Sequence, residues 1–160
     1  MSGLYLGLMS GTSIDGIDAV VAAFEGSRLI GLHASHHHDY SPELRTQLLR
    51  ISIDQPALSF REYCSLDVEI GQAFANAACE ILARNRIPAS AITAIGSHGQ
   101  TLFHDGPAGL TLQMGDAHRI AAATGITTIS DFRRLDMALG GQGAPLAPAF
   151  HQALFANAVE

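Results

Sequence analysis

The sequence contains no tryptophan, no lysine, two cysteines, and nine arginines against 15 acidic residues. At a formal net charge of −6, the chain has too few cations for a basic face that follows a nucleic-acid backbone. No apolar run approaches the roughly 18 residues that span a bilayer, and the amino terminus lacks the basic and apolar regions of a secretion signal. We therefore expect no nucleic-acid partner, no membrane insertion and a cytoplasmic location.

The two cysteines, Cys64 and Cys79, fall in one predicted helix, about four turns apart along its axis. That separation exceeds the short Cα distance that a disulfide requires. We expect both to be free thiols buried in the core of a protein from a reducing compartment.

Apolar residues make up 48% of the sequence, and charged residues only 15%. A chain of 160 residues with this composition is long enough to bury one core, and it is unlike a disordered or fibrous sequence. We expect a single domain over residues 1–160, of the α/β class.

The hydrophobic pattern predicts three strands followed by alternating helices and strands, so that helices pack on a mixed sheet. The three strands form an antiparallel meander because their connections are short. The expected elements are strands over 4–9, 17–24 and 29–35, a helix of about three turns that begins at Ser41-Pro42-Glu43, a long helix from the S-x-x-E capping box at Ser59 to Pro88, a strand over 91–97, a strand over 110–114, a helix from Asp116 to Ala123 closed by Gly125, a strand over 126–130 and a helix over 148–158.

The segment LMSGTSIDGIDAVV, residues 8–21, connects the first two predicted strands. Gly11 allows the backbone to approach a ligand, and Thr12 and Ser13 add hydroxyl donors. Such a turn can hold phosphate in a nest of N–H groups. Asp15-Gly16 is also a strong hairpin dipeptide, and the spacing alone favours an ordinary hairpin over a phosphate site.

The segment GSHGQT, residues 96–101, is expected as a loop just past a buried strand, where open α/β sheets gather their ligands. His98 is a candidate donor or general base, and Gln100 and Thr101 are candidates to hold sugar hydroxyls. The alternative is a loop histidine whose ring is satisfied within the protein.

The segment DFRRLD follows the next predicted strand and carries Asp131, Arg133, Arg134 and Asp136. Arginine recognises carboxylate or phosphate through its planar fork, and a carboxylate can orient a hydroxyl or act as a base. A surface ion pair is the alternative. The glycine-rich run over 140–145 indicates a close backbone approach to a ligand, because it is too poor in side chains to serve packing.

Two histidine groups invite a metal interpretation. In HASHHHD, residues 33–39, successive side chains of a strand alternate between faces, so three consecutive histidines cannot converge on one ion, and a solvated strand end is expected. The set of His98, His104, Asp105 and His118 is a second candidate, as the site of a metal-dependent hydrolase, although its spacing matches no zinc pattern.

Three segments together resemble the anhydro-N-acetylmuramic acid kinases of bacterial cell-wall recycling: GLMSGTSIDGIDAVV; AIGSHGQTLFHDGP with TLQMGDAHRIAAATGI; and DFRRLDMALGGQGAPLAPAFHQALF. The likeness runs from Leu4 to about Phe155. It implies one ribonuclease-H-like half of the fold shared by sugar kinases, heat-shock ATPases and actin, in which two halves clamp ATP. It also assigns phosphate binding to the GTSxDGxD segment, which comprises Gly11, Thr12, Ser13, Ile14, Asp15, Gly16, Ile17 and Asp18.

The reaction implied by the resemblance uses ATP and water to open the 1,6-anhydro bridge of anhydro-N-acetylmuramic acid and to phosphorylate O6. We expect Mg²⁺ to be held by Asp15 or Asp18. By location and residue type, the sugar is assigned to Gln100, Thr101, Asp131, Arg133 and Asp136, with Arg133 facing the lactyl carboxylate.

The sequence departs from the family in length, and it contains no DTGPGN-like motif, where the family carries its catalytic aspartate. We therefore expect an amino-terminal half that lacks its carboxy-terminal partner and is inactive alone, with the catalytic base beyond residue 160 and Asp131 or Asp136 as weaker candidates. A second copy of the chain is a further potential partner, in a homodimer. The alternative function is a non-catalytic half-domain that binds sugar or nucleotide.

Overall fold

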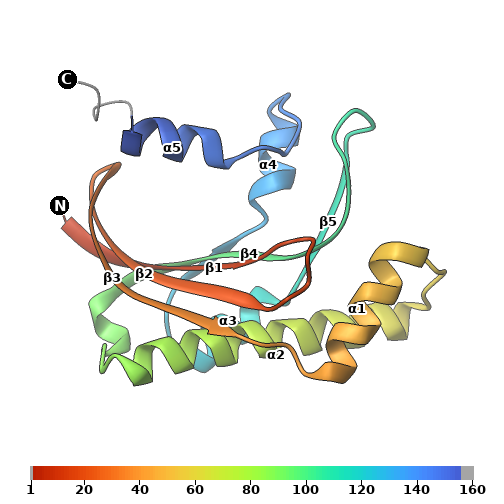
Figure 1. The fold of residues 1–160 in the computed structure, drawn as a ribbon, viewed down its shortest axis with the longest axis horizontal. Coiled ribbons are helices and arrows are strands. Elements are labelled where there is room, and N and C mark those ends of the chain that lie inside the picture. The colour runs from red at the N-terminus through yellow and green to blue at the C-terminus, as the bar shows by residue number, and fades with distance from the viewer. Residues whose placement is uncertain (1, 156–160) are drawn as a thin grey trace.

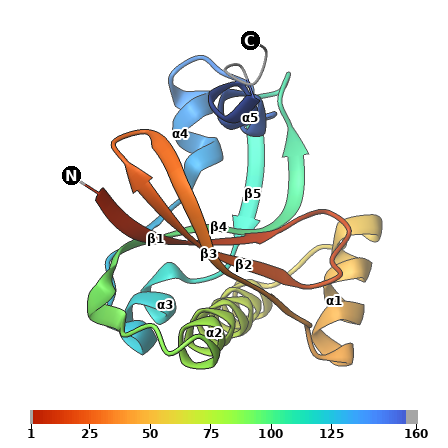
Figure 2. The ribbon, with the colours of Figure 1, turned by 60° about the vertical axis from the view of Figure 1, so that its left-hand side comes forward.

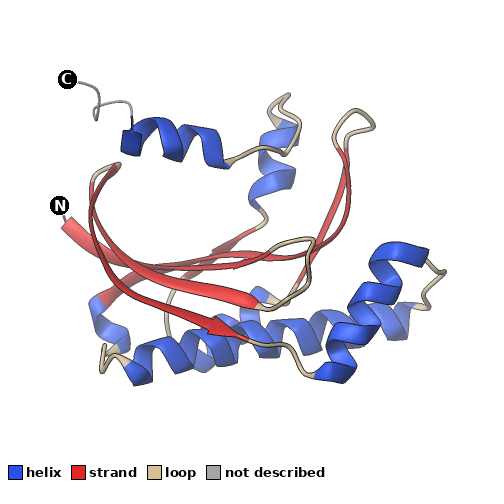
Figure 3. Ribbon diagram, viewed as in Figure 1, coloured by secondary structure: helices blue, strands red, loops and turns tan. Residues whose placement is uncertain are grey.

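The computed structural model describes residues 2–155, and it has a mixed α/β architecture with one six-stranded sheet (Figure 1, Figure 3). The strands are β1 (Ser2–Ser10), β2 (Ile17–Glu25), β3 (Arg28–His38), β4 (Ile92–Asp105), β5 (Leu110–Met114) and β6 (Thr128–Ser130). The helices are α1 (Pro42–Asp54), α2 (Phe60–Arg84), α3 (Ala117–Thr124), α4 (Phe132–Ala138) and α5 (Ala147–Phe155), with a short 3₁₀ turn at Ala89–Ala91.

The sheet joins an antiparallel meander to a parallel centre. Its order is β3-β2-β1-β4-β5, with β1 antiparallel to β2 and β2 antiparallel to β3. β4 runs parallel to β1, and its other edge is shared by β6, which is parallel, and β5, which is antiparallel. The predicted meander and the mixed sheet are confirmed, and the arrangement is that of a ribonuclease-H-like half-domain.

Two helices begin where local signals predicted them. The Ser41 side chain accepts a hydrogen bond from Leu44 N at 3.1 Å, and a proline occupies the first turn of α1. At the start of α2, Ser59 and Glu62 form both bonds of the capping box. Because these caps satisfy backbone N–H groups within four residues, sequence alone could locate them.

One face of the sheet is covered by α1, α2 and α3, and α4 and α5 lie on the other side (Figure 2). The apolar stripe of α2 is fully buried between the sheet and α3, with Ile70, Phe74 and Ile81 at 0% exposure. Within the part of the chain that the structure describes, no helix is long and apolar enough to cross a membrane.

Some expectations need correction. Residues 96–101 do not form a loop; they lie inside β4, which continues to Asp105 because β1 and β5 pair with it there. The cysteines are free, but both are exposed rather than buried in the core. Helix α4 was not anticipated, and the helix expected over 148–158 is observed to Phe155, while residues 156–158 lie outside the described residues.

Helix α2 also fixes the corner between β5 and α3. Asp67 accepts hydrogen bonds from Gly115 N through its carboxylate, at 2.8 Å, and from Asp116 N through its backbone carbonyl, at 3.1 Å. One turn further along α2, Gly71 lets the backbone of Asp116 come close: a Cβ at Gly71 would lie 2.7 Å from Asp116 N and 2.8 Å from its carbonyl oxygen. The corner between β5 and α3 therefore requires glycine at position 71.

We predict that Gly71→Ala destabilises the protein by about 1–3 kcal/mol, because α3 must move away from α2. A glycine-to-alanine change inside a helix is ordinarily stabilising by about 0.5–1 kcal/mol, so the sign of the effect is diagnostic. Urea unfolding measures it, with the exposed neighbour Gln72→Ala as a control that stays within about 0.5 kcal/mol of the wild type. A stabilised Gly71→Ala variant would contradict the close approach.

Candidate functional site

A bulge in β4 brings the sequence-predicted segments together. Leu8 pairs with Ser97 and Ser10 with Gln100, so two residues of β4, His98 and Gly99, oppose one residue of β1. Gly99 has φ +72°, and a Cβ there would lie 2.8 Å from Met114 O, so a side chain has no room. On the other edge of β4, β6 ends at Ser130, opposite Ser97. The bulge thus lies between the turn after β1 and the segment that follows β6.

Side chains from other parts of the chain donate hydrogen bonds to the backbone of the turn between β1 and β2. Three of its carbonyl oxygens accept hydrogen bonds: Gly16 O from Ser10 Oγ at 2.6 Å, Gly11 O from Gln100 Nε2 at 2.9 Å, and Ile14 O from Arg45 Nε at 2.9 Å. Ile14 adopts φ +52°, and its side chain is fully buried. The residue with left-handed backbone geometry in this turn is therefore the buried Ile14. It is not Asp15 or Gly16, which an ordinary hairpin would place there.

The outer edge of this turn carries hydroxyl and carboxylate groups. Thr12, Ser13 and Asp15 are exposed, and Ser13 Oγ donates to Asp15 Oδ1 at 2.9 Å. That bond, followed by bonds from backbone N–H groups at Asp15 and Gly16, holds the pKa of the Asp15 carboxyl below its ordinary value. Asp15 is therefore ionised throughout the neutral range.

Asp18 has a different environment. It lies on β2 with its carboxylate 2.7 Å from His37 Nδ1 on β3, and that hydrogen bond is the main cause that raises the pKa of His37. Asp18 thus already has a hydrogen-bonding partner, whereas Asp15 extends from the turn itself.

Gln100 and Thr101 point into the protein. Gln100 is fully buried. Its Oε1 accepts from Tyr40 OH at 3.1 Å and lies 2.7 Å from Ser10 Oγ, whose one proton it shares with Gly16 O. Its Nε2 donates to Gly11 O and to Thr101 O, each at 2.9 Å. Thr101 is buried as well, and its hydroxyl has no hydrogen-bond partner among the described residues. Neither side chain lines the cavity described below.

His98 is fixed by two hydrogen bonds. Arg133 Nε donates to His98 Nε2 at 2.9 Å, so Nδ1 carries the ring proton and donates it to Gly99 O, also at 2.9 Å. Burial is the main cause that lowers the pKa of His98, and the charge of Arg133 adds to it. The imidazole is therefore neutral at pH 7, in a defined tautomer.

The glycine-rich loop after α4 wraps around the same arginine. Arg133 Nη1 donates to Gly143 O at 3.0 Å, and Asp136 Oδ2 accepts from Gly143 N at 2.8 Å. Gly141 N donates to the backbone carbonyl of Asp136 at 2.9 Å. The glycines thus allow the backbone to come close to the side chains of Arg133 and Asp136, and not to a ligand as the sequence suggested.

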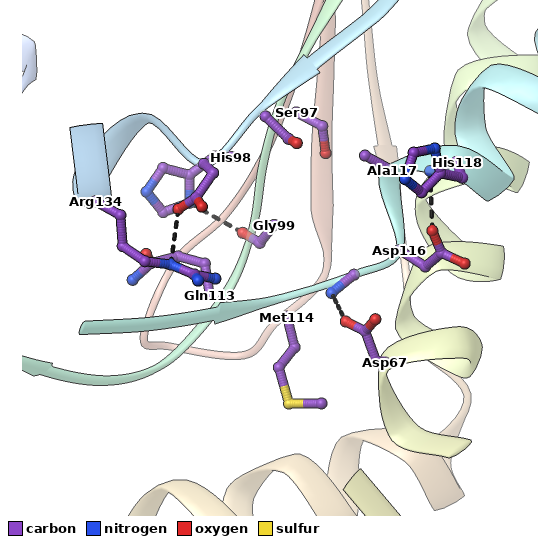
Figure 4. A pocket seen from close by; sticks show the side chains of 13 residues that line it. Asp67, Ser97, His98, Gly99, Gln113, Met114, Asp116, Ala117, His118 and Arg134 are labelled. Atoms are coloured by element: carbon purple, nitrogen blue, oxygen red, sulfur yellow. Dashed lines mark hydrogen bonds and ion pairs between the residues drawn. The ribbon is translucent and has the colours of Figure 1, made fainter. Parts of the chain in front are cut away.

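A cavity of about 240 Å³ opens beside the bulge (Figure 4). His98, Gln113 and Arg134 lie on one side, and Asp67, Asp116 and His118 on the other. Arg134 and Asp131 pair at 3.0 Å at its border, and both are partly exposed. The cavity therefore combines both signs of charge with neutral donors and acceptors.

Two residues that line this cavity each carry a buried polar oxygen with no hydrogen-bond partner among the described residues. Ser97 Oγ, on a residue of 1% exposure, and Gln113 Oε1 make no hydrogen bond with any described residue. An unpaired buried polar group costs about 1–3 kcal/mol, so each is a candidate to bind a ligand hydroxyl or amide.

The structure brings His98, Asp131 and Arg134 to the cavity, and it places Arg133 and Asp136 behind it. Sequence reasoning missed the residues contributed by other elements. These are Asp67, Ser97, Gln113 and Asp116 in the cavity, and Tyr40 and Arg45 behind the turn. Ser97 lies within GSHGQT, and Gln113 and Asp116 lie within TLQMGDAHRIAAATGI, but sequence reasoning assigns no ligand-binding role to their side chains. Asp67, Tyr40 and Arg45 lie outside every segment singled out, because their partners are distant in the sequence.

The hydrolase interpretation of His98, His104, Asp105 and His118 is wrong for the described residues. No three of them bring ligand atoms close enough to share a metal ion, since the one such group in the described part of the chain is elsewhere. His104 instead bonds Thr111 Oγ1 at 3.1 Å, and His98 is bonded to Arg133.

The depressed pKa of His98 predicts a pH effect on stability. Between the lowered pKa and the ordinary value of 6.5, the unfolded chain binds a proton that the folded protein excludes, so the free energy of unfolding falls as pH is lowered through this window. We expect the free energy of unfolding of His98→Gln to fall less between pH 7 and pH 5 than that of the wild type. Urea unfolding of both proteins at pH 7 and pH 5 measures it, and an equal pH dependence in the two would contradict the assignment.

Comparisons with known proteins identify similar sequences. A family model described as "Anhydro-N-acetylmuramic acid kinase" matches residues 3–160. The chain is 51% identical over 161 aligned residues to the anhydro-N-acetylmuramic acid kinase of Xylella fastidiosa (strain Temecula1 / ATCC 700964), with 98% of this chain and 42% of that protein covered. It is 50% identical over 155 residues to the enzyme of the same name from Aliivibrio fischeri (strain ATCC 700601 / ES114), with 94% and 41% covered.

The chain thus spans about two fifths of the length of these relatives. The match extends over nearly all of its residues, including the turn, the β4 bulge and the DFRRLD segment. The chain belongs to the anhydro-N-acetylmuramic acid kinase family.

Proposed function

We propose that the complete enzyme carrying this chain is an ATP-dependent kinase that opens the 1,6-anhydro bridge of anhydro-N-acetylmuramic acid and phosphorylates O6, giving N-acetylmuramic acid 6-phosphate. Family membership and the names of the relatives support the substrate and the reaction class. Because ATP is a cytoplasmic substrate, we place the reaction in the cytoplasm. The observation that carries the proposal is a cavity whose lining residues hold unpaired buried oxygens, on the opposite edge of β4 from a turn suited to phosphate.

The cavity has the chemistry of a sugar site. Ser97 Oγ and Gln113 Oε1 offer unused hydrogen-bonding capacity to sugar hydroxyls or to the N-acetyl group. Asp131 lines the cavity and can accept from a hydroxyl. We propose that Gln100 and Thr101 act indirectly, because their side chains face the protein interior.

Arg134 is better situated than Arg133 to bind the lactyl carboxylate. Arg134 lines the cavity, where it pairs with Asp131. Arg133 already uses Nε and Nη1 on His98 and on Gly143 O, so we propose that it positions the histidine and the glycine-rich loop.

The reaction needs a base that takes a proton from water as the water attacks the anomeric carbon, while the leaving O6 receives the γ-phosphoryl group. Of the two candidates in this chain, Asp131 borders the cavity, whereas Asp136 is engaged with the backbone of Gly143. Asp131 is therefore the candidate that this chain offers, alongside a carboxylate supplied by the carboxy-terminal half.

The turn over 11–18 is proposed to bind the phosphates of ATP. Gly11 leaves open space above the backbone, because a Cβ there would meet only Ser13 Oγ, at 3.8 Å. Thr12 and Ser13 add exposed hydroxyls, and ionised Asp15 supplies the oxygen ligand that Mg²⁺ prefers. Asp15 fits this role better than Asp18, whose carboxylate is bonded to His37. When bound, Mg²⁺ would neutralise charge that develops on the phosphates.

The proposal is tested by measuring ADP release from ATP in the complete enzyme, with anhydro-N-acetylmuramic acid as the acceptor. We expect turnover that requires the sugar and Mg²⁺, and a product phosphorylated at O6. Turnover with an ordinary hexose but none with the anhydro-sugar would contradict the assignment.

We predict that Gly11→Val in the complete enzyme raises the KM for ATP at least tenfold and leaves the KM for the sugar within twofold. The added side chain occupies the phosphate approach without a clash inside the protein, so stability should be retained. Gly31→Val on β3, where a Cβ also has open space, is the matched control. An unchanged KM for ATP in the Gly11 variant would reject the phosphate site.

Ser97→Ala tests the sugar site. Removal of an unpaired buried hydroxyl should leave the free energy of unfolding unchanged or raise it, whereas sugar affinity should fall about 3- to 10-fold for one lost hydrogen bond. Calorimetry with the sugar and thermal unfolding measure the two effects, with Ser35→Ala on β3 as a control. Wild-type sugar affinity in Ser97→Ala would place the sugar elsewhere.

A further inference from the structure

Two of the three consecutive histidines on β3 share a face. His36 pairs with Ala19 and His38 with Ile17 across the sheet, and both partners are fully buried beneath α2. The imidazoles therefore lie on the helix-covered face, with side chains only 11% and 18% exposed. His37 points to the opposite face, so the predicted alternation is confirmed, but the expectation of a solvated strand end is wrong for His36 and His38.

The buried pair meets an acidic residue of α2. His36 Nε2 lies 2.8 Å and His38 Nδ1 lies 3.1 Å from the same carboxylate oxygen, Glu80 Oε2. One nitrogen from each ring and one carboxylate oxygen all lie within 4.8 Å of one another. Ligand atoms around a tetrahedral zinc ion are separated by about 3.3 Å, so the three groups need only small movements to share an ion.

The charge of the cluster also suits a cation. Glu80 contributes a carboxylate, and both imidazoles contact the same oxygen of it. Two imidazoles with one carboxylate favour a borderline transition metal such as Zn²⁺ over Mg²⁺ or Ca²⁺, which prefer oxygen ligands alone.

An ion has a route to this cluster. The side chain of Glu80 is 40% exposed, and a cavity of about 430 Å³ opens beside His38, bordered also by Glu69 and Asn76. Three protein ligands leave the fourth position of a tetrahedral ion to water.

We propose that His36, His38 and Glu80 form a binding site for a divalent transition metal ion of the Zn²⁺ type. The site fastens the edge strand β3 to α2. Two strands, β2 and β1, separate β3 from β4, so the site is distinct from the cavity. The proposal does not depend on the kinase activity.

The test is titration of the metal-free full chain with Zn²⁺ by calorimetry, repeated with Co²⁺, whose visible absorption reports coordination. We expect one ion per chain and a higher thermal midpoint with Zn²⁺. Glu80→Gln and His38→Ala should each weaken binding at least tenfold and remove the gain in thermal midpoint. His37→Ala, which changes the neighbouring histidine on the opposite face, is the matched control and should bind as the wild type does.

Two results would overturn the proposal: no saturable binding of one ion per chain, or an equal loss of binding in His37→Ala. Glu80 lies at the partly exposed edge of the cluster, so we expect Glu80→Gln to fold. If His38→Ala does not fold, the Zn²⁺ affinity of Glu80→Gln alone tests the proposal. Circular dichroism of each metal-free variant establishes its folding before the titration.

Discussion

The side-chain amide of Gln100 holds the functional end of this protein together. It is fully buried, and its four hydrogen bonds connect Ser10 at the end of β1, Gly11 in the following turn, Tyr40 before α1 and the backbone of Thr101. A buried amide that makes all of its hydrogen bonds holds its partners in fixed positions, whereas a buried amide without them would lower the stability of the fold. The turn over 11–18 is therefore a pre-formed element rather than a flexible hairpin.

The bulge immediately before Gln100 relates the two proposed ligand sites. On one edge of β4 lie β1 and the turn, and on the other edge lie β6, β5 and the cavity. The same four residues, 97–100, contribute Ser97 and His98 to the cavity and Gln100 to the turn. A kinase must hold its phosphate donor and its acceptor within reach of one another, and we propose that this short segment of strand relates the two sites in the complete enzyme.

Local signals made much of the fold predictable. The Ser41 and Ser59 caps and the left-handed Gly125 satisfy backbone groups within a few residues, so α1, α2 and α3 could be located from sequence. The continuation of β4 could not, because it depends on pairing with β1, some 90 residues away, and on a bulge at Gly99. The same holds for the cavity, where Asp67 and Gln113 come from separate elements. For the histidine run, alternation was predictable but the partner Glu80, 44 residues from His36, was not.

The central claim is that residues 97–100 of β4 organise a phosphate site on one edge and a sugar site on the other. A crystal structure of the complete enzyme with a non-hydrolysable ATP analogue and anhydro-N-acetylmuramic acid tests it most directly. We expect the phosphates against Thr12 and Ser13, and sugar oxygens within hydrogen-bond distance of Ser97 Oγ and Gln113 Oε1. A sugar bound away from this cavity, or phosphates with no contact to the turn, would contradict it.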